Sequence, residues 1–154
     1  VYYSGYRSKN STLDKKDESP LREKRLYQGD YLIKYYNFKP EEILDGNNLP
    51  RNIDPKLYRA LNKIRDFPLE INSASYKELI QVPGIGPVRA EKINNLKKTI
   101  TVYNIKELNL PAKSMHFLKC NGKYLGLWKD RKKIKKFFQS EDSNNMIKLS
   151  LFNK

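Results

Sequence analysis

The chain has 154 residues, of which 38% are hydrophobic, and it carries a net charge of +14. This length allows one domain or two very small ones with a modest core, and no apolar run approaches the roughly 20 residues that a membrane-spanning helix needs. A single cysteine, Cys120, and a single histidine, His116, exclude an intramolecular disulfide and a multi-cysteine or multi-histidine metal site within this chain. We therefore expect a cytoplasmic protein with no membrane partner. Because the sequence begins with Val1 rather than Met, we also expect it to be a piece of a longer protein.

The positive charge is concentrated in the second half of the chain. Residues 1–70 hold 14 Lys and Arg against 11 Asp and Glu, whereas residues 71–154 hold 17 against 6. This asymmetry favours a phosphate-bearing partner for the second half. An acidic membrane surface is the competing partner, but it requires a helix with a strong apolar face beside its charges, and only residues 125–138 come near that pattern.

A helix is predicted over residues 21–38. Its tyrosines recur at every fourth position, as Tyr27, Tyr31 and Tyr35, and therefore share one face. A stripe of large apolar residues at helical spacing is more often part of a core than a platform for a ligand. We therefore expect these three tyrosines to be buried.

Two further helices are predicted in the first half. Pro40 begins a short helix that ends near residues 45–46, because proline fits the first helical turn. Asp54 is the expected N-cap of the next helix, which begins at Pro55 and ends at Phe67.

Residues 72–98 predict two helices joined by a tight hairpin. Ser75 and Glu78 have the spacing of a capping box, which begins the first helix. The hairpin is Pro83–Gly84–Ile85–Gly86, and Pro87 begins the second helix. Two helices with such a short connection pack directly against each other.

Residues 101–118 look like a weaker copy of this unit that lacks the two glycines. No strand is predicted, apart from an extended end at residues 146–152. The expected fold is therefore all-α, a small helical domain built around the hairpin with a degenerate second hairpin. The expected regions are an N-terminal helical segment (1–70), the hairpin region (71–124), and a basic helix with a C-terminal tail (125–154).

The hairpin has the features of a phosphate-binding site. Gly84 and Gly86 supply backbone angles that other residues avoid, and they let a phosphate approach the main chain. The amides of both glycines and of Val88 lie at a helix N-terminus, where the dipole attracts an anion. The side chains of Arg89 and Lys92 project from the same end, whereas we expect Ile85 to turn inward. Such contacts recognise the backbone rather than the bases, so the expected partner is DNA, bound with a strong dependence on salt.

The segment from Asn72 to Ile93 resembles the helix-hairpin-helix family of DNA-repair and DNA-handling proteins. The resemblance implies binding to the sugar-phosphate backbone, with duplex DNA as the expected form. It also implies a potassium or sodium ion on hairpin carbonyls near Val82 and Ile85.

Further segments resemble, in the same order, a bacterial family of radical-SAM proteins of DNA modification or repair. These segments are residues 2–4, 22–28, 54–57, the hairpin and 117–123. The resemblance implies that this chain is the C-terminal part of a longer enzyme. An N-terminal barrel would then hold an iron-sulfur cluster and S-adenosylmethionine on a cysteine triad that this chain does not contain. The resemblance also implies a uracil-DNA-glycosylase-like protein as a partner.

No catalytic residue is predicted in the chain. The first acidic residues after the hairpin are Glu91 and Glu107, and their positions do not fit the catalytic acid of a helix-hairpin-helix glycosylase. The sequence also shows no pattern of a nucleophile with a neighbouring base. The alternative function is a protein-interaction or lid domain that covers the barrel of the parent enzyme without touching DNA. The nearly charge-balanced residues 1–65 suit that role.

Two features of the C-terminal region stay open. Residues 129–138 form a basic amphipathic run, which is either a solvated helix end packed through Trp128, Ile134 and Phe137 or a second phosphate contact. The tail at residues 148–152 resembles the bacterial sliding-clamp-binding motif, with Lys148 in place of its glutamine. A clamp would bind the apolar side chains of the tail, whereas the alternative is that they fold back onto the domain. These side chains are Leu149, Leu151 and Phe152.

Overall fold

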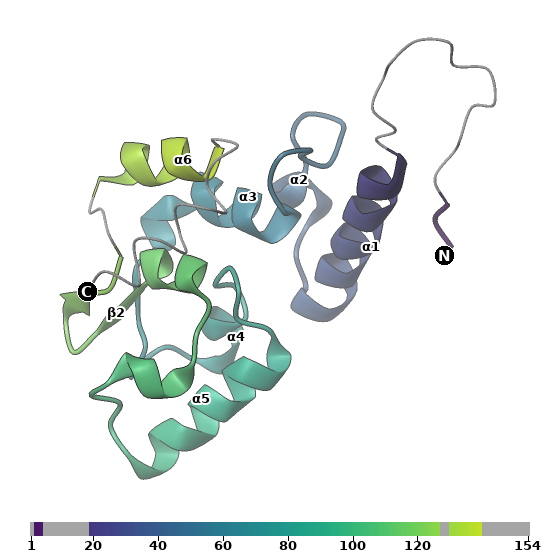
Figure 1. Cartoon of the computed structure of the whole chain (residues 1–154). Coiled ribbons are helices and arrows are strands. Elements are labelled where there is room, and N and C mark those ends of the chain that lie inside the picture. The colour runs from purple at the N-terminus through teal and green to yellow at the C-terminus, as the bar shows by residue number, and fades with distance from the viewer. Residues whose placement is uncertain (1, 5–18, 127–129, 140–154) are drawn as a thin grey trace, which may run out of the picture. The chain divides into compact units, whose positions relative to one another are not determined.

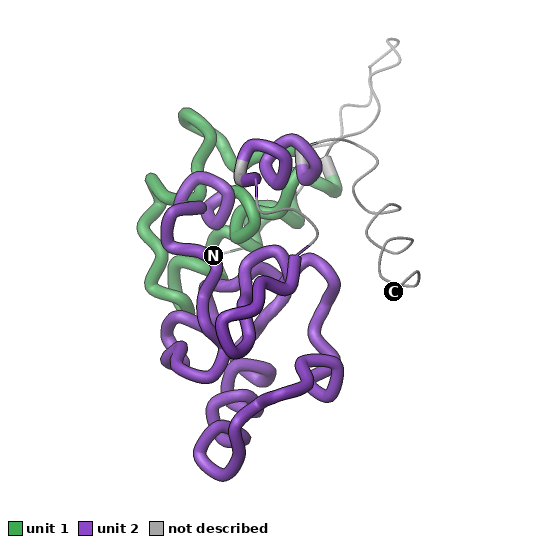
Figure 2. Tube along the Cα trace, turned by 90° about the vertical axis from the view of Figure 1, so that its left-hand side faces the viewer, with its two compact units in different colours: residues 1–58 green, residues 59–154 purple. Residues whose placement is uncertain are grey.

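A computed structural model describes residues 2–4, 19–126 and 130–139, and the chain divides into two compact units, residues 1–58 and 59–154 (Figures 1 and 2). The described part is mostly helical, as the sequence predicts, and none of its helices is long and apolar enough to cross a membrane. In chain order, with η for a 3-10 helix, the elements are α1 (Ser19–Tyr36), α2 (Pro40–Ile43), α3 (Pro55–Asn62), η1 (Ile64–Asp66), β1 (Leu69–Glu70), α4 (Tyr76–Leu79), α5 (Pro87–Thr99), η2 (Ile105–Leu108), η3 (Ala112–Phe117), β2 (Leu118–Cys120), β3 (Lys123–Tyr124) and α6 (Arg131–Gln139).

Helices α2 and α3 begin at the predicted prolines. Asp54 caps α3, because its carboxylate accepts a hydrogen bond of 2.9 Å from the Leu57 amide. Helix α3 ends at Asn62, earlier than the predicted end at Phe67, and the chain tightens into η1. Phe67 itself is extended, as expected of a residue that precedes proline.

The prediction that the tyrosine stripe of α1 is buried is wrong. Tyr27, Tyr31 and Tyr35 are 39%, 46% and 66% exposed. Their rings contact one another or Tyr3, with centroids 4.6 Å apart for Tyr31 and Tyr35 and 5.3 Å apart for Tyr3 and Tyr27. The core of this unit contains Leu32 of α1, together with Phe38, Ile43 and Leu49.

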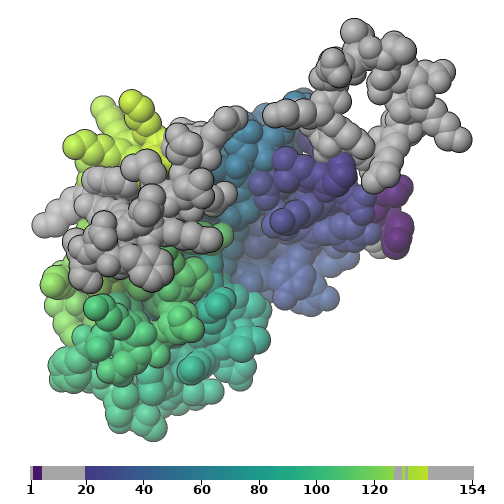
Figure 3. Space-filling model, viewed as in Figure 1, coloured from purple at the N-terminus to yellow at the C-terminus, as the bar shows by residue number. Residues whose placement is uncertain are grey.

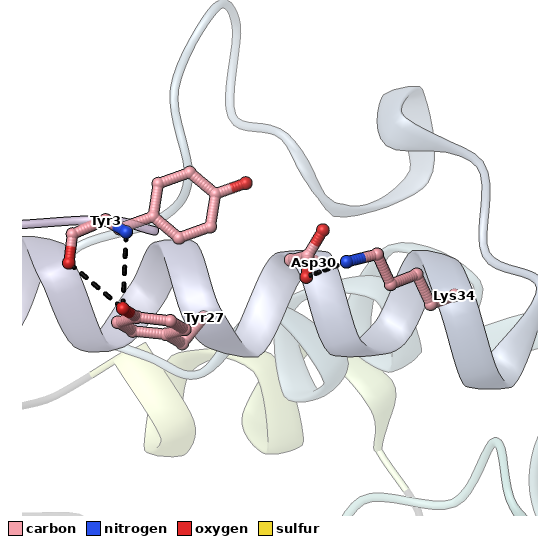
Figure 4. A network of polar contacts seen from close by, with 4 residues as sticks. All are labelled: Tyr3, Tyr27, Asp30 and Lys34. Atoms are coloured by element: carbon pink, nitrogen blue, oxygen red, sulfur yellow. Dashed lines mark hydrogen bonds and ion pairs between the residues drawn. The ribbon is translucent and has the colours of Figure 1, made fainter. Parts of the chain in front are cut away.

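Gly29 explains which face of α1 is covered. A Cβ atom at Gly29 would lie 3.1 Å from Cδ1 of Leu49, so the missing side chain allows the following loop to approach the helix on that face. The tyrosines tolerate exposure because each ring carries a polar hydroxyl. The Tyr27 hydroxyl, for example, hydrogen-bonds both the amide and the carbonyl of Tyr3, beside the ion pair of Lys34 and Asp30 (Figure 4).

The second unit contains a three-stranded sheet, which the all-α prediction did not include. Strand β2 pairs in parallel with β1 and antiparallel with β3, and Leu69 lies opposite Leu118. Strands of two or three residues are too short to show a periodicity of two. The turn between β2 and β3, however, is Asn121–Gly122 with both residues in the left-handed region, and an Asn-Gly pair is a strong hairpin signal in a sequence.

Polar side chains tie this sheet to the segment that follows α5. The Glu70 carboxylate accepts hydrogen bonds from the amides of Asn121 at 3.0 Å and Gly122 at 2.9 Å. The Asn72 side chain donates to the Val102 carbonyl at 3.0 Å and accepts from the Val102 amide at 2.9 Å. Partial burial raises the pKa of Glu70, but the backbone N–H groups outweigh it and the pKa is lowered overall. The segment around residue 102 is thereby fixed without a strand of its own.

The lone histidine and the lone cysteine are both buried. His116 is 4% exposed, and its ring centroid lies 5.3 Å from that of Phe138. Burial lowers the pKa of His116 to about 4. Burial also raises the pKa of Cys120, which disfavours the reactive thiolate.

Stability should depend on the protonation of His116. Its pKa is about 4 in the folded chain against an ordinary value of 6.5, so the unfolded chain binds more protons between these two values. The free energy of unfolding should therefore be fully present above pH 6.5 and fall as the pH is lowered toward 4. Urea denaturation between pH 7 and about 5.5, where carboxylates remain almost fully ionised, measures the first part of this loss. A His116→Phe variant should lose the dependence, and an unchanged dependence in that variant would contradict the assignment.

Candidate nucleic-acid interface

The predicted capping box fixes the entry into the hairpin. The Ser75 hydroxyl accepts a hydrogen bond from the Glu78 amide at 3.3 Å, and the Glu78 carboxylate accepts one from the Ser75 amide at 2.7 Å. The Ser75 amide is the main cause of a lowered pKa of Glu78. Helix α4 is only one turn long. These hydrogen bonds fix its start, and its last residue, Leu79, is fully buried.

The hairpin turns directly from α4 into α5. The Ile85 amide donates to the Val82 carbonyl at 3.1 Å, and the Ile85 side chain is fully buried, as predicted. Gly86 is the N-cap of α5, and its carbonyl accepts the first helical hydrogen bond from the Ala90 amide at 2.9 Å. Since the Ile85 side chain points inward, the hairpin can offer a ligand only its main chain at this position.

The 3-10 helix η3 supports the hairpin from behind. The hydroxyl of Ser114 donates a buried hydrogen bond of 2.8 Å to the Pro83 carbonyl. A Cβ atom at Gly84 would lie 2.6 Å from Oγ of Ser114 and 3.2 Å from Cβ of Pro111. The predicted weaker copy of the hairpin thus forms two short 3-10 helices, η2 and η3, and the second of them packs against the first hairpin.

The packing of η3 gives a different reason for glycine at position 84 than the approach of a phosphate. Gly84 has φ +88° and faces Ser114, so it is required by its backbone angle and by the close approach of η3 rather than by a ligand. Gly86 has φ −96°, which any residue adopts, so its backbone angle does not require glycine. Of the two positions, Gly86 is therefore the one where a missing side chain is consistent with the approach of a phosphate.

The predicted contact residues of α5 lie at its N-terminal end and are exposed. Val88 is 82% exposed, and Arg89 and Lys92 are also exposed. Nη1 of Arg89 lies 3.5 Å from the Gly84 carbonyl, so its guanidinium stays next to the hairpin. Arg89 and Lys92 are three residues apart and share a helix face. The structure therefore brings the predicted site residues together around one helix end, with only main-chain atoms available from Ile85.

Sequence reasoning missed the support that Ser114 and Pro111 give to the hairpin. Ser114 and Pro83 are 31 residues apart, and no local pattern connects them.

The tail residues of the proposed clamp contact, Leu149, Leu151 and Phe152, lie outside the described residues, as does Trp128. Within the described ranges, no group of three or more His, Cys, Asp or Glu could hold a metal ion.

Comparison with protein families finds a match that covers the hairpin. Residues 69–93 match the model of the helix-hairpin-helix motif, from β1 to the middle of α5. The match supports a general capability to bind nucleic acid. Comparisons with curated proteins and with solved structures gave no match.

Replacing Gly84 with alanine should destabilise the chain more than replacing Gly122. Both glycines have positive φ, 88° and 76°, so alanine strains the backbone at each position by about 1–2 kcal/mol. Only Gly84 has neighbours, Ser114 and Pro111, within 4 Å of an added Cβ. Chemical denaturation should therefore give a larger loss for Gly84→Ala, by about 1 kcal/mol or more. Equal losses for the two variants would show that η3 does not press against the hairpin.

Proposed function

We propose that residues 69–93 bind the sugar-phosphate backbone of DNA without reading its sequence. The observation that carries the proposal is the N-terminal end of α5, where a phosphate would meet main-chain amides and two cations together. The first turn of a helix has N–H groups without helical partners, and its dipole favours an anion. Gly86 adds no side chain at this point, and Arg89 and Lys92 are exposed beside it.

The mode of binding follows from the groups available. Main-chain amides and lysine or arginine side chains form hydrogen bonds and ion pairs with phosphate oxygens, which are the same for every base. The described part of the motif presents no helix face with amide side chains placed for base recognition in a major groove. Duplex DNA of any sequence is therefore the proposed partner, bound with an affinity that falls steeply with salt.

Replacing both cations of the site should weaken binding equally for all sequences. We expect Arg89→Ala with Lys92→Ala to lower the affinity for duplex DNA and to reduce the slope of log affinity against log salt by about 2. Fluorescence anisotropy with duplexes of two unrelated sequences measures both quantities. Lys98→Ala, which removes one charge from the last turn of the same helix, is the control and should have a much smaller effect. If the double variant binds as tightly as the unchanged chain, the site lies elsewhere.

A side chain at Gly86 should test the approach of the phosphate itself. Because the backbone angles of Gly86 suit any residue, Gly86→Val is expected to leave the fold intact and to reduce binding by obstructing the helix end. Circular dichroism checks the fold, and the same anisotropy assay checks the affinity. Unchanged affinity in a folded Gly86→Val variant would argue against contact at the hairpin.

A monovalent cation on the hairpin is part of the proposal. Carbonyl oxygens replace the hydration shell of potassium or sodium well. The Val82 carbonyl accepts one hydrogen bond, from Ile85, and a carbonyl has two lone pairs, so this oxygen could also coordinate a cation. The carbonyls of Val82 and Ile85 would hold the ion, which would add positive charge beside a bound phosphate.

The wider setting is proposed from sequence resemblance alone. The chain would act as the C-terminal part of a radical-SAM enzyme of DNA modification or repair, with a uracil-DNA-glycosylase-like protein as a partner. The tail residues Leu149, Leu151 and Phe152 would bind a sliding clamp. The parent enzyme is tested by the reading frame upstream of Val1, which should encode a cysteine triad.

The clamp contact is tested by retention of the chain on purified clamp, which Leu151→Ala with Phe152→Ala should abolish.

A second candidate function is a docking surface for the rest of such an enzyme. The exposed tyrosines of α1 favour it, since Tyr27, Tyr31 and Tyr35 are exposed on the nearly charge-balanced first unit and the rings of Tyr31 and Tyr35 contact each other. Aromatic residues are enriched at protein interfaces. Tyr31→Ser with Tyr35→Ser should then abolish association with the catalytic barrel and leave the affinity for DNA unchanged.

A further inference from the structure

Helix α6 carries a dense cluster of positive charge on its outer side. Its sequence from Arg131 to Gln139 contains no acidic residue. Lys132, Lys133, Lys135 and Lys136 are all exposed. In the space-filling view, the yellow-green atoms of α6 stand at the surface of the second unit (Figure 3).

The apolar side of α6 is occupied by the protein itself. Ile134 is 3% exposed and Phe138 is 2% exposed. The Phe138 ring lies 5.3 Å from the His116 ring and 6.0 Å from the Phe117 ring, measured between centroids. Phe137, which the sequence offered for this packing, also contacts the His116 ring at 6.1 Å between centroids, and Phe138 is the more deeply buried of the two. The helix therefore packs on η3, with Lys132 and Lys136 on the opposite side and Lys133 and Lys135 on its two flanks, where Lys135 contacts Asn62.

The same 3-10 helix supports the hairpin. Ser114 of η3 bonds the Pro83 carbonyl, and His116 and Phe117 of η3 contact α6. The hairpin and α6 are thus fixed to one element of the second unit. Ser114 and His116 are only two residues apart, so the hairpin and α6 border the same short helix and one duplex could contact both.

The burial of Ile134 and Phe138 decides between the two anionic partners that such a helix attracts. A membrane-surface helix inserts an exposed apolar face into the lipid boundary, and α6 has no such face to offer because it packs on η3. A row of exposed lysines above a packed face needs only phosphates.

We propose that α6 is a second phosphate-binding surface, which contacts the same DNA duplex as the hairpin at a point further along its length. The proposal rests on the function proposed above for the hairpin. The lysines of α6 would add affinity and fix the direction of the duplex across the second unit, without adding sequence preference.

The test is a triple variant of the full chain, Lys132→Ala, Lys133→Ala and Lys136→Ala. Alanine favours the helix, and the buried residues are untouched, so the fold should persist. On a duplex of about 20 base pairs, we expect the slope of log affinity against log salt to fall by about one for each lysine that contacts a phosphate. The loss should be the same for duplexes of two unrelated sequences, because lysines contact phosphates that are the same for every base.

The control removes three exposed charges from the first unit, with Lys24→Ala, Lys34→Ala and Lys39→Ala. An equal loss of affinity in this control would overturn the proposal as a general effect of charge. Unchanged binding of the α6 variant, while Arg89→Ala with Lys92→Ala weakens binding, would overturn it and leave the hairpin function standing. If neither variant loses affinity, the hairpin function falls as well. Loss of binding to anionic lipid vesicles with unchanged DNA binding would identify a membrane surface instead.

Discussion

The hydrogen bond from the Ser114 hydroxyl to the Pro83 carbonyl is the contact on which the second unit depends. It is buried, it measures 2.8 Å, and it joins residues 31 positions apart. A buried carbonyl without a partner costs about 1–3 kcal/mol, so the tight turn of the hairpin needs a donor at this place. Serine reaches the carbonyl only because Gly84 has no side chain in the way. Two small residues, Gly84 in the hairpin and Ser114 in η3, therefore determine how closely the hairpin and η3 approach. The 3-10 helix η3 in turn packs against α6 and is followed directly by β2.

Support from behind matters for binding because main-chain recognition requires a fixed backbone. An amide can meet a phosphate oxygen at low entropic cost only if the angles of the turn are set before the ligand arrives. Val82, Pro83 and Ile85 are fully or almost fully buried, so the inner side of the hairpin is held by packing as well as by the Ser114 bond. The polar network of Glu70 and Asn72 holds the start of the same segment against the sheet. The hairpin is thereby a rigid edge of the unit rather than a mobile loop between two helices.

The parts of the fold that follow from the sequence are those whose hydrogen bonds span three or four residues. The caps at Asp54 and Ser75 and the helix start at Pro87 are of this kind, and each is confirmed. Contacts between distant residues left no local pattern, which is why the parallel pair of β1 and β2 and the role of Ser114 were not predicted. The burial of the tyrosine stripe failed for another reason. Helix α1 has two faces with large side chains, and a single glycine, Gly29, decides that the face next to Leu49 is covered.

Helices α1 and α6 show how the two units differ in what they expose. In α6 the apolar residues Ile134 and Phe138 are buried and the exposed side chains of known burial are charged, whereas α1 leaves rings with polar hydroxyls in contact with water. A lysine surface attracts phosphate over the distance of a Debye length, about 8–10 Å at ordinary salt, while an aromatic surface acts only on contact. In the proposed binding mode, the amides of the hairpin and the cations of α5 and α6 contact phosphates and so do not distinguish one base from another. In that mode, any preference for particular DNA would come from the shape and flexibility of the duplex, because two separated phosphate contacts favour duplexes that fit both without bending.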